Sequence, residues 1–244
     1  MNKQIKQQKV LVEFRNVKKV FGSGKNKITA LKNLSFKIFQ GQNVSLIGAN
    51  GAGKTTTVEM IMGINEPTSG RIFYPLSKNK KQMKKDFGIQ FQDSTYPSFL
   101  YVKDIVNFII KSYNIKIAEQ ELEKMVKMFK VESFYNHKAS SLSGGQSQRL
   151  NILLSLLHKP KLVILDELST GLDIVVRNEF KKMIKQYAKE QGITIVLISH
   201  DANEIMTLAD RIIILKKGEI YKDVLVKQFK NANEIEDFIE SNIV

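Results

Sequence analysis

A phosphate-binding loop constrains the fold of this chain more than any other feature. The run Gly48-Ala-Asn-Gly-Ala-Gly-Lys-Thr55 fits the pattern G-x-x-x-x-G-K-[ST]. The short apolar segment Val44–Ile47 leads into the loop and predicts a buried strand, and Thr55–Ile64 after it predicts a helix. In that context the glycines turn successive backbone amides toward one centre, where phosphate oxygens bind. The loop therefore predicts a nucleotide site between a strand and a helix.

The side chains of the loop extend this prediction to a metal ion. Lys54 places a positive charge beside the phosphates, and the Thr55 hydroxyl is a suitable ligand for Mg²⁺. The residues expected to bind the phosphates are Gly48, Ala49, Asn50, Gly51, Ala52, Gly53, Lys54, Thr55 and Thr56.

The rest of the chain alternates strand and helix patterns. Its 244 residues allow one α/β domain with a satellite subdomain, or two small domains. Val10–Phe14 and Leu34–Ile38 alternate apolar and polar residues, which predicts antiparallel strands at one edge. Apolar residues recur at helical spacing between about residues 100 and 135, which predicts a helical insert. Strands that alternate with helices predict a mainly parallel sheet with helices on both faces.

The second half of the chain continues this alternation. Strands are predicted at Leu162–Leu165 and Thr194–Ile198, with helices before and after each. Lys216–Glu219 predicts a hairpin turn, and the spacing of Ile235, Phe238 and Ile239 predicts a terminal helix.

Composition and charge limit where the chain works and what it binds. No apolar run reaches the ~18–20 residues of a membrane helix. The N-terminal residues are polar, without the apolar core of a signal peptide, so we expect a cytoplasmic protein. Cysteine is absent, which excludes disulfides and thiolate chemistry. The net charge of +14 could indicate a nucleic-acid or membrane surface, but the densest lysine cluster, Lys78–Lys85, has no interleaved aromatic residues. We therefore favour lysines spread over solvated faces, with a minor attraction to membranes.

Two adjacent carboxylates, Asp166 and Glu167, end the predicted strand Leu162–Leu165. The carboxyl end of a buried parallel strand lies in the crevice where such sheets bind ligands. Asp166 is suited to hold Mg²⁺, and Glu167 to polarise the attacking water. On their own the two carboxylates could equally be a solvated strand end, and the phosphate loop is what favours the catalytic interpretation.

Three further residues have a predicted function only if the chain has a nucleotide site. His200 follows the strand Thr194–Ile198 and could donate a hydrogen bond to a γ-phosphate. Gln92 ends a short, mainly apolar predicted strand that begins at Phe87, and it could contact Mg²⁺ or water through its amide. Phe21 precedes Gly22 and offers a ring on which adenine could stack. Without that context they are a capping histidine, an ordinary glutamine and a core phenylalanine.

A pentapeptide, Leu142-Ser-Gly-Gly-Gln146, precedes a predicted helix. Ser143 is a typical N-cap, and the same geometry presents amides and a hydroxyl to an anion. The pentapeptide cannot serve its own phosphate loop if the two lie at distant ends of one domain.

In this order, the motifs resemble the ATP-binding-cassette (ABC) family, specifically the separate ATP-binding subunit of a membrane transporter. The resemblance extends from about Val10 to Lys222. The matching elements are Phe21, the phosphate loop, Gln92, the signature Leu142–Gln146, Asp166 with Glu167, the contact loop Ser169–Asp173, and His200.

The resemblance implies a fold and its division. We expect an α/β P-loop NTPase core with a mainly parallel sheet, an N-terminal antiparallel β subdomain, and a helical insert that carries the signature. The whole chain, 1–244, is then one nucleotide-binding domain. The core with its β subdomain is expected at about 10–92 and 160–222, the helical subdomain at about 93–159 and a C-terminal helix at about 223–244.

The resemblance also implies a mechanism. Two subunits associate head to tail, and each ATP lies between one phosphate loop and the signature of the partner, with Mg²⁺. Closure of the dimer drives integral membrane permease subunits from the cytoplasmic face of the membrane. A groove near Gln92 receives a helix of the permease. The family's pattern assigns Glu167, His200 and Gln92 to catalysis, Thr55, Gln92 and Asp166 to the metal, and Phe21, residues 48–56, Ser143, Gly144, Gly145, Gln146 and Asp173 to ATP.

The sequence departs from the family pattern at two positions. Leu168 and Ile174 stand where the family usually has proline. Proline would fix φ and remove an amide donor, and both carboxylates are kept without it, so we expect little loss of chemistry.

Two alternatives remain open at this stage: a soluble cassette ATPase of iron–sulfur assembly, and a nucleic-acid-associated cassette protein. The first shares the cassette but needs no membrane partner. The second is weakened by the short interval between Gln92 and Leu142, which leaves no room for a long coiled coil. Among transporter subunits, the segments Asn50–Thr57 and Thr170–Asp173 resemble those of multidrug or polysaccharide exporters more than those of sugar importers, so export is the expected direction.

Overall fold

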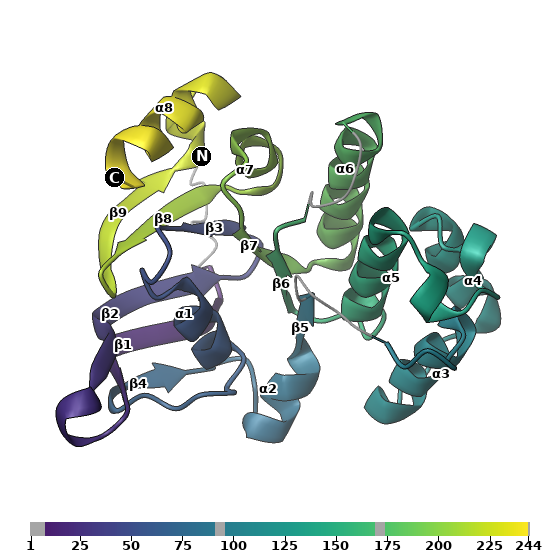
Figure 1. Cartoon of the computed structure of the whole chain (residues 1–244), viewed down its shortest axis with the longest axis horizontal. Helices are drawn as coiled ribbons and strands as arrows, with labels where there is room; N and C mark the ends of the chain where they lie inside the picture. Colours follow the sequence, from purple (N-terminus) through teal and green to yellow (C-terminus); the bar gives the residue numbers. More distant parts are fainter. Residues whose placement is uncertain (1–7, 91–95, 169–173, 244) are drawn as a thin grey trace, which may run out of the picture.

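The fold is built on two neighbouring sheets (Figure 1). The computed structural model describes residues 8–90, 96–168 and 174–243. The smaller sheet is antiparallel, in the order β2-β1-β4. Its strands are β1 (Val10–Phe21), β2 (Ile28–Phe39) and β4 (Ser69–Phe73).

The larger sheet occupies the centre of the molecule and is mainly parallel. Its order is β5-β6-β7-β3-β8-β9, and only the pair β8 and β9 is antiparallel. Its strands are β3 (Val44–Ile47), β5 (Phe87–Gln90), β6 (Leu162–Asp166), β7 (Thr194–Ile198), β8 (Arg211–Lys216) and β9 (Glu219–Leu225). All five residues of β7 are buried, because helices or the second sheet cover both faces. The carboxyl ends of β3, β6 and β7 meet at one edge, where ligands bind in such sheets.

Two hydrophobic cores lie on opposite faces of the central sheet. Along β6, Leu162 and Ile164 belong to one core, and Val163 and Leu165 to the other, because successive side chains of a strand point to opposite faces. The first core also contains the small sheet and the apolar side of the helix after the phosphate loop.

Helices cover both cores, and α3, α4 and α5 lie together at the end of the molecule opposite the small sheet (Figure 1). The helices are α1 (Lys54–Ile61), α2 (Lys80–Asp86), α3 (Val102–Tyr113), α4 (Glu119–Met128), α5 (Gly144–Leu156), α6 (Ile174–Gln191), α7 (Ala202–Leu208) and α8 (Ala232–Ile243). Short 3₁₀ turns are found at Gly24–Asn26, Glu132–Phe134, Ala139–Ser141 and Val226–Gln228. None of the helices among the described residues has the length and apolar character needed to cross a membrane.

The predicted α/β architecture, with its antiparallel subdomain and mainly parallel sheet, is confirmed. The hairpin at Lys216–Glu219 and the terminal helix are also found. The division at about residues 93 and 159 stays a prediction.

Several local predictions were incomplete. Strand β4 was missed because all of its residues are exposed or half-buried, which leaves little apolar pattern. Helix α2 was missed because Met83 and Asp86 are its only buried residues, so its sequence reads as a lysine cluster. Helix α1 ends at Ile61 and not at Ile64, since Gly63 adopts a left-handed conformation with φ 63°.

The strand that leads into the phosphate loop is held in the middle of the sheet by Asn43. Its side-chain oxygen accepts a hydrogen bond from the amide of Ile195 at 2.9 Å, and its side-chain amide donates to the Leu208 carbonyl at 2.9 Å. The Asn43 amide donates to the Asp210 carboxylate at 2.8 Å. β3 is thereby fixed between β7 and β8, both of which come far later in the chain.

Candidate nucleotide site

Ten of the predicted nucleotide residues converge on one cleft at the carboxyl edge of the central sheet, while Gly48, Ala49 and Ala52 belong to the phosphate loop but do not line the cleft. The cleft has a volume of about 440 Å³ and is bounded by the phosphate loop, the ends of β6 and β7, the end of β1 and the start of β2. Predicted residues that line it are Phe21, Asn50, Gly51, Gly53, Lys54, Thr55, Thr56, Asp166, Glu167 and His200. The sequence analysis had not singled out Ile28, Thr29 and Ala30, which also line it.

The phosphate loop is packed between β2 and the β8–β9 hairpin. Gly53 has φ 104°, and a Cβ there would lie 2.9 Å from the Ala30 carbonyl oxygen, so this position requires glycine. On the other side, the Gly218 amide donates to the Ala52 carbonyl at 3.1 Å, and the Gly218 carbonyl accepts from the Lys32 amide at 2.9 Å. The hairpin turn therefore links the loop to β2.

Lys54 folds along the loop and faces the two carboxylates. Its Nζ donates to the carbonyls of Gly48 at 2.5 Å and Ala49 at 3.2 Å. Burial lowers the pKa of Lys54, and the charges of Asp166 and Glu167 oppose that shift. The cation and both carboxylates thus share one electrostatic environment.

Asp166 and Glu167 leave β6 in different backbone conformations. Asp166 ends the strand, and its amide donates to the Gln90 side-chain oxygen at 3.1 Å. Burial, followed by the neighbouring Glu167 charge, raises the pKa of Asp166, and Lys54 opposes the rise. Glu167 has φ 49°, a left-handed conformation that is uncommon for such a residue, and its amide donates to the Ile198 carbonyl at 2.9 Å. This bond ties Glu167 to the end of β7.

His200 follows that same strand end and lines the cleft opposite the phosphate loop. The residues on both sides of it are fixed, since the Asp201 amide donates to Ser199 Oγ at 3.0 Å and Asp201 caps α7. Burial lowers the pKa of His200, and the positive charge of Lys54 lowers it further. The negative charge of Glu167 opposes this shift. The lowered pKa favours the neutral form of His200, which carries one ring N–H for donation.

Gln92 and Asp173, two predicted site residues, lie outside the described residues. Within the described part, Gln90 and Gln148 form a polar link that the sequence analysis missed. Gln90 is fully buried. Its side-chain oxygen accepts from the Asp166 amide, and its side-chain nitrogen lies 3.5 Å from the side-chain oxygen of Gln148. Gln148, on α5, donates to the Leu168 carbonyl at 3.1 Å. The available signal was a polar residue at the end of a short apolar run, two positions before Gln92 in the sequence.

Leu168, which stands where the family usually has proline, is held by packing and by one hydrogen bond. Its side chain is buried in the core beside α5, and its carbonyl is held by Gln148. Packing therefore restrains the segment after Glu167.

The signature lies outside the cleft. Ser143 caps α5: its Oγ accepts from the Gln146 amide at 3.2 Å, and the Gln146 side chain accepts from the Ser143 amide at 2.9 Å. Gly144 begins the helix, and a Cβ on it would meet nothing within 4 Å. None of the described residues Leu142–Gln146 lines the nucleotide cleft. Packing within this chain therefore gives no reason for glycine at position 144.

The sequence model of the family described as "ABC transporter" matches residues 31–170, from β2 to beyond the two carboxylates. The chain belongs to the ABC transporter family. It is accordingly an ABC transporter ATPase, which binds ATP and couples its hydrolysis to transport. The alternatives of iron–sulfur assembly and nucleic-acid association receive no support from this match.

Relatives of this ABC transporter ATPase support the same assignment. It is 33% identical to the spermidine/putrescine import ATP-binding protein PotA of Mycoplasma mycoides, over 96% of this chain and 68% of the relative. It is 32% identical to the PotA protein of Mesoplasma florum, over 96% of this chain and 71% of the relative.

Solved structures show the same fold. The ATP-binding cassette MJ0796, in a dimeric post-hydrolysis state bound to ADP and Pi, gives a TM-score of 0.78 at 30% identity, over 89% of this chain and all of that one. The cassette cbiO1 from Clostridium perfringens, part of the ABC transporter complex cbiONQ, gives 0.76 at 27% identity, over 96% of this chain and 95% of that one.

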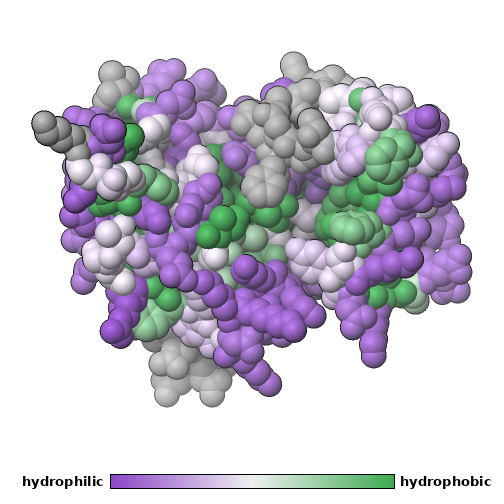
Figure 2. Space-filling model, turned by 60° about the horizontal axis from the view of Figure 1, so that its bottom comes forward, coloured by the Kyte–Doolittle hydropathy of each residue, from purple (hydrophilic) through white to green (hydrophobic). Residues whose placement is uncertain are grey.

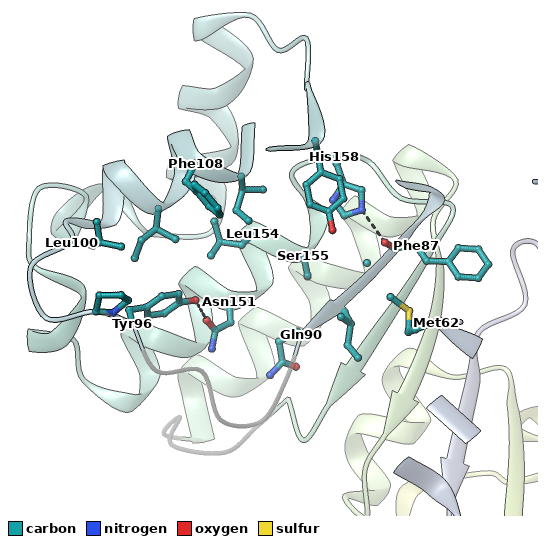
Figure 3. A pocket seen from close by; sticks show the side chains of 16 residues that line it. Met62, Phe87, Gln90, Tyr96, Leu100, Phe108, Asn151, Leu154, Ser155 and His158 are labelled. Atoms are coloured by element: carbon teal, nitrogen blue, oxygen red, sulfur yellow. Dashed lines mark hydrogen bonds between the residues drawn. The ribbon is translucent and has the colours of Figure 1, made fainter. Parts of the chain in front are cut away.

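This ABC subunit has a second concavity, an apolar groove between β5, α3 and α5 (Figure 3). Its volume is about 480 Å³. Phe108 of α3 is 66% exposed at its edge, an unusual exposure for so large an apolar side chain. Deeper in the groove, the Tyr96 hydroxyl donates to the Asn151 side chain, and His158 Nε2 donates to the Phe87 carbonyl at 3.1 Å. Figure 2 shows apolar side chains gathered in a hollow on this side of the molecule, with hydrophilic side chains around it.

Proposed function

We propose that this chain pairs head to tail with a second ABC subunit, that two ATP molecules close the dimer, and that closure drives an importer through integral membrane permease subunits. The observation that carries the pairing is the separation of the signature from the nucleotide cleft. The cleft would supply phosphate-binding and catalytic groups, and the signature presents a capped helix start at which a Cβ on Gly144 would meet no described residue within 4 Å. A second subunit would complete the site.

Within that site, each residue has a proposed role. Phe21 stacks on the base, the amides of residues 48–53 and Lys54 bind the β- and γ-phosphates, and His200 donates to the γ-phosphate. Glu167 polarises the attacking water. Ser143, Gly144, Gly145, Gln146 and Asp173 act from the partner subunit.

The cleft also suits Mg²⁺. Thr55 lies exposed in the first turn of α1, and Asp166 lines the same cleft, so a hydroxyl and a carboxylate oxygen face the phosphate position. These are the hard oxygen ligands that Mg²⁺ prefers, together with phosphate oxygens. Thr55, Asp166 and Gln92 would hold the ion, which would neutralise phosphate charge during hydrolysis.

The apolar groove is the proposed docking site for a cytoplasmic helix of the permease. Its floor is β5, whose last residue, Gln90, holds the amide of Asp166 and contacts Gln148 behind the signature. A helix that docks in the groove could therefore shift β5, and Gln90 would transmit that shift both to Asp166 in the nucleotide cleft and to Gln148 on the helix that begins at the signature. The subunit would accordingly work at the cytoplasmic face of the membrane.

Phe108→Glu tests the groove. We expect this change to weaken association with the membrane partner by about 30-fold or more, because loss of a buried aromatic contact commonly costs ~2 kcal/mol. The readout is the fraction of the tagged chain that is retained on membranes of the source cells. Ile64→Glu is the matched control, since Ile64 is 57% exposed but lies outside the groove. Equal membrane retention of the two variants would refute the groove as the docking site.

The direction of transport departs from the sequence-based expectation. The exporter interpretation finds no support among the relatives, since the PotA proteins are named as import proteins. We therefore propose import, with polyamines as the first cargo class to test.

Uptake measurements decide the direction and the cargo class. Cells that carry the chain with an inactivated site are expected to take up radiolabelled spermidine or putrescine more slowly than cells with the intact chain. Unchanged uptake together with slower efflux of a preloaded compound would reverse the direction.

A further inference from the structure

Phe21, the proposed base platform, has a cation on its ring. Lys19 lies two residues earlier on β1, so the two side chains share one face of the strand. Lys19 Nζ lies 4.8 Å from the centroid of the Phe21 ring, inside the ~6 Å range of a cation–π interaction.

A loop between α1 and β4 anchors that cation. Lys19 Nζ donates a hydrogen bond to the Glu66 carbonyl at 2.8 Å. The same loop clamps the strand backbone, because the Thr68 amide donates to the Lys18 carbonyl at 2.8 Å and Thr68 Oγ1 accepts from the Val20 amide at 3.0 Å. The ammonium group is therefore held at a fixed place by a segment that continues from the phosphate-loop helix.

The Phe21 ring borders the nucleotide cleft, whereas the cation on the ring does not line it. Phe21 lines the nucleotide cleft, together with its cross-strand neighbour Ile28 on β2. Lys19 does not line that cleft. Its hydrogen-bond acceptor is a neutral carbonyl, and no carboxylate in the described part of the chain forms an ion pair with it. The Lys19 ammonium group thus lies on the Phe21 ring without a direct ion pair, although its charge also acts on the nearby Glu66 carboxylate.

We propose that Lys19 is a positioning residue for the base of the nucleotide: its ammonium group fixes the Phe21 ring and draws electron density toward the face on which it lies, which leaves the other face open to the base. A ring polarised in this way attracts the electron-rich purine more strongly on its open face. A phenylalanine has no hydroxyl with which to anchor itself, so the cation supplies the orientation. The inference rests on the proposed nucleotide site and deepens it.

Comparing the affinity for ATP with the affinity for tripolyphosphate distinguishes a role at the base from a simple attraction between Lys19 and the phosphates. Lys19→Met keeps an unbranched side chain and removes the charge. We expect it to raise the Kd for ATP and ADP about 2- to 5-fold, the equivalent of ~0.5–1 kcal/mol. The inhibition constant of tripolyphosphate, which has no base, should stay unchanged, as should kcat at saturating ATP. Lys19→Arg should retain the wild-type affinity, and Lys18→Met, a change at the neighbouring exposed lysine, is the matched control.

A double-mutant cycle with Phe21 gives the decisive comparison. In a Phe21→Ala background, Lys19→Met should have no further effect on the Kd for ATP, because the ring through which it acts is gone. An equal effect in both backgrounds, or a parallel loss of tripolyphosphate affinity, would overturn the proposal for Lys19. Failure of Phe21→Ala itself to weaken ATP binding would instead refute the base platform in the proposed function. Urea unfolding of each variant verifies that the fold is kept.

Discussion

Replacing Glu167 with Gln is expected to leave ATP binding intact and to lower turnover about 10²- to 10⁴-fold, the usual contribution of a general base. That loss corresponds to ~3–5 kcal/mol of activation free energy. Glutamine has nearly the same shape, so the left-handed backbone at this position and its hydrogen bond to Ile198 are unaffected by the change. The variant should therefore fold normally and lose only the negative charge that polarises the attacking water.

The measurement pairs single-turnover hydrolysis with a direct binding assay for ATP. Glu190→Gln, on the exposed surface of α6, is the control for removal of a carboxylate. Hydrolysis that proceeds undiminished in purified Glu167→Gln protein would refute the catalytic assignment. A parallel loss of ATP affinity would instead assign Glu167 to nucleotide binding.

Ser143→Arg should abolish dimer-dependent hydrolysis while each subunit still binds ATP in its own cleft. The signature lies outside that cleft, so a long cation at position 143 leaves the phosphate loop of the same chain untouched. In the closed dimer it would displace the donors that face the γ-phosphate of the partner, and loss of one such donor commonly costs 10²–10³-fold in rate. Ser133→Arg is the control, because it adds the same long cation at an exposed serine outside the signature.

Mixing two inactive variants tests whether the signature acts across the dimer. A dimer of one Glu167→Gln subunit and one Ser143→Arg subunit contains one site with both defects and one site with neither. Partial recovery of hydrolysis on mixing is the expected result. Full activity of Ser143→Arg alone would contradict the role of the signature.

Local sequence pattern was sufficient for the parts of the site that one segment builds. The pattern of the phosphate loop lies within one segment, its glycines, Lys54 and the flanking strand and helix, so the loop could be recognised without knowledge of its distant contacts. Asp166 and His200 were found because buried parallel strands are continuous apolar runs whose ends are easy to locate. Their convergence on one cleft followed from the rule that such ends meet at one edge.

The features that the sequence did not predict depend on contacts between segments far apart in the chain. Gln90 reads as an ordinary residue until the sheet order puts β5 next to β6 and brings its amide to Asp166. Helix α2 presents mostly solvated lysines, so its periodicity carries little information. The significance of Leu168 likewise appears only when the packing against α5 is known.

The position of β3 has a consequence for the synthesis of the chain. The phosphate loop follows residue 47, yet its strand is held between β7 and β8, and its glycine turn is held by Gly218. A growing chain cannot complete these pairings until residues beyond 218 have left the ribosome, and contacts of such long sequence separation form slowly. Competence to bind ATP therefore arises late in biogenesis, and a nascent or truncated subunit would not consume ATP before it could assemble.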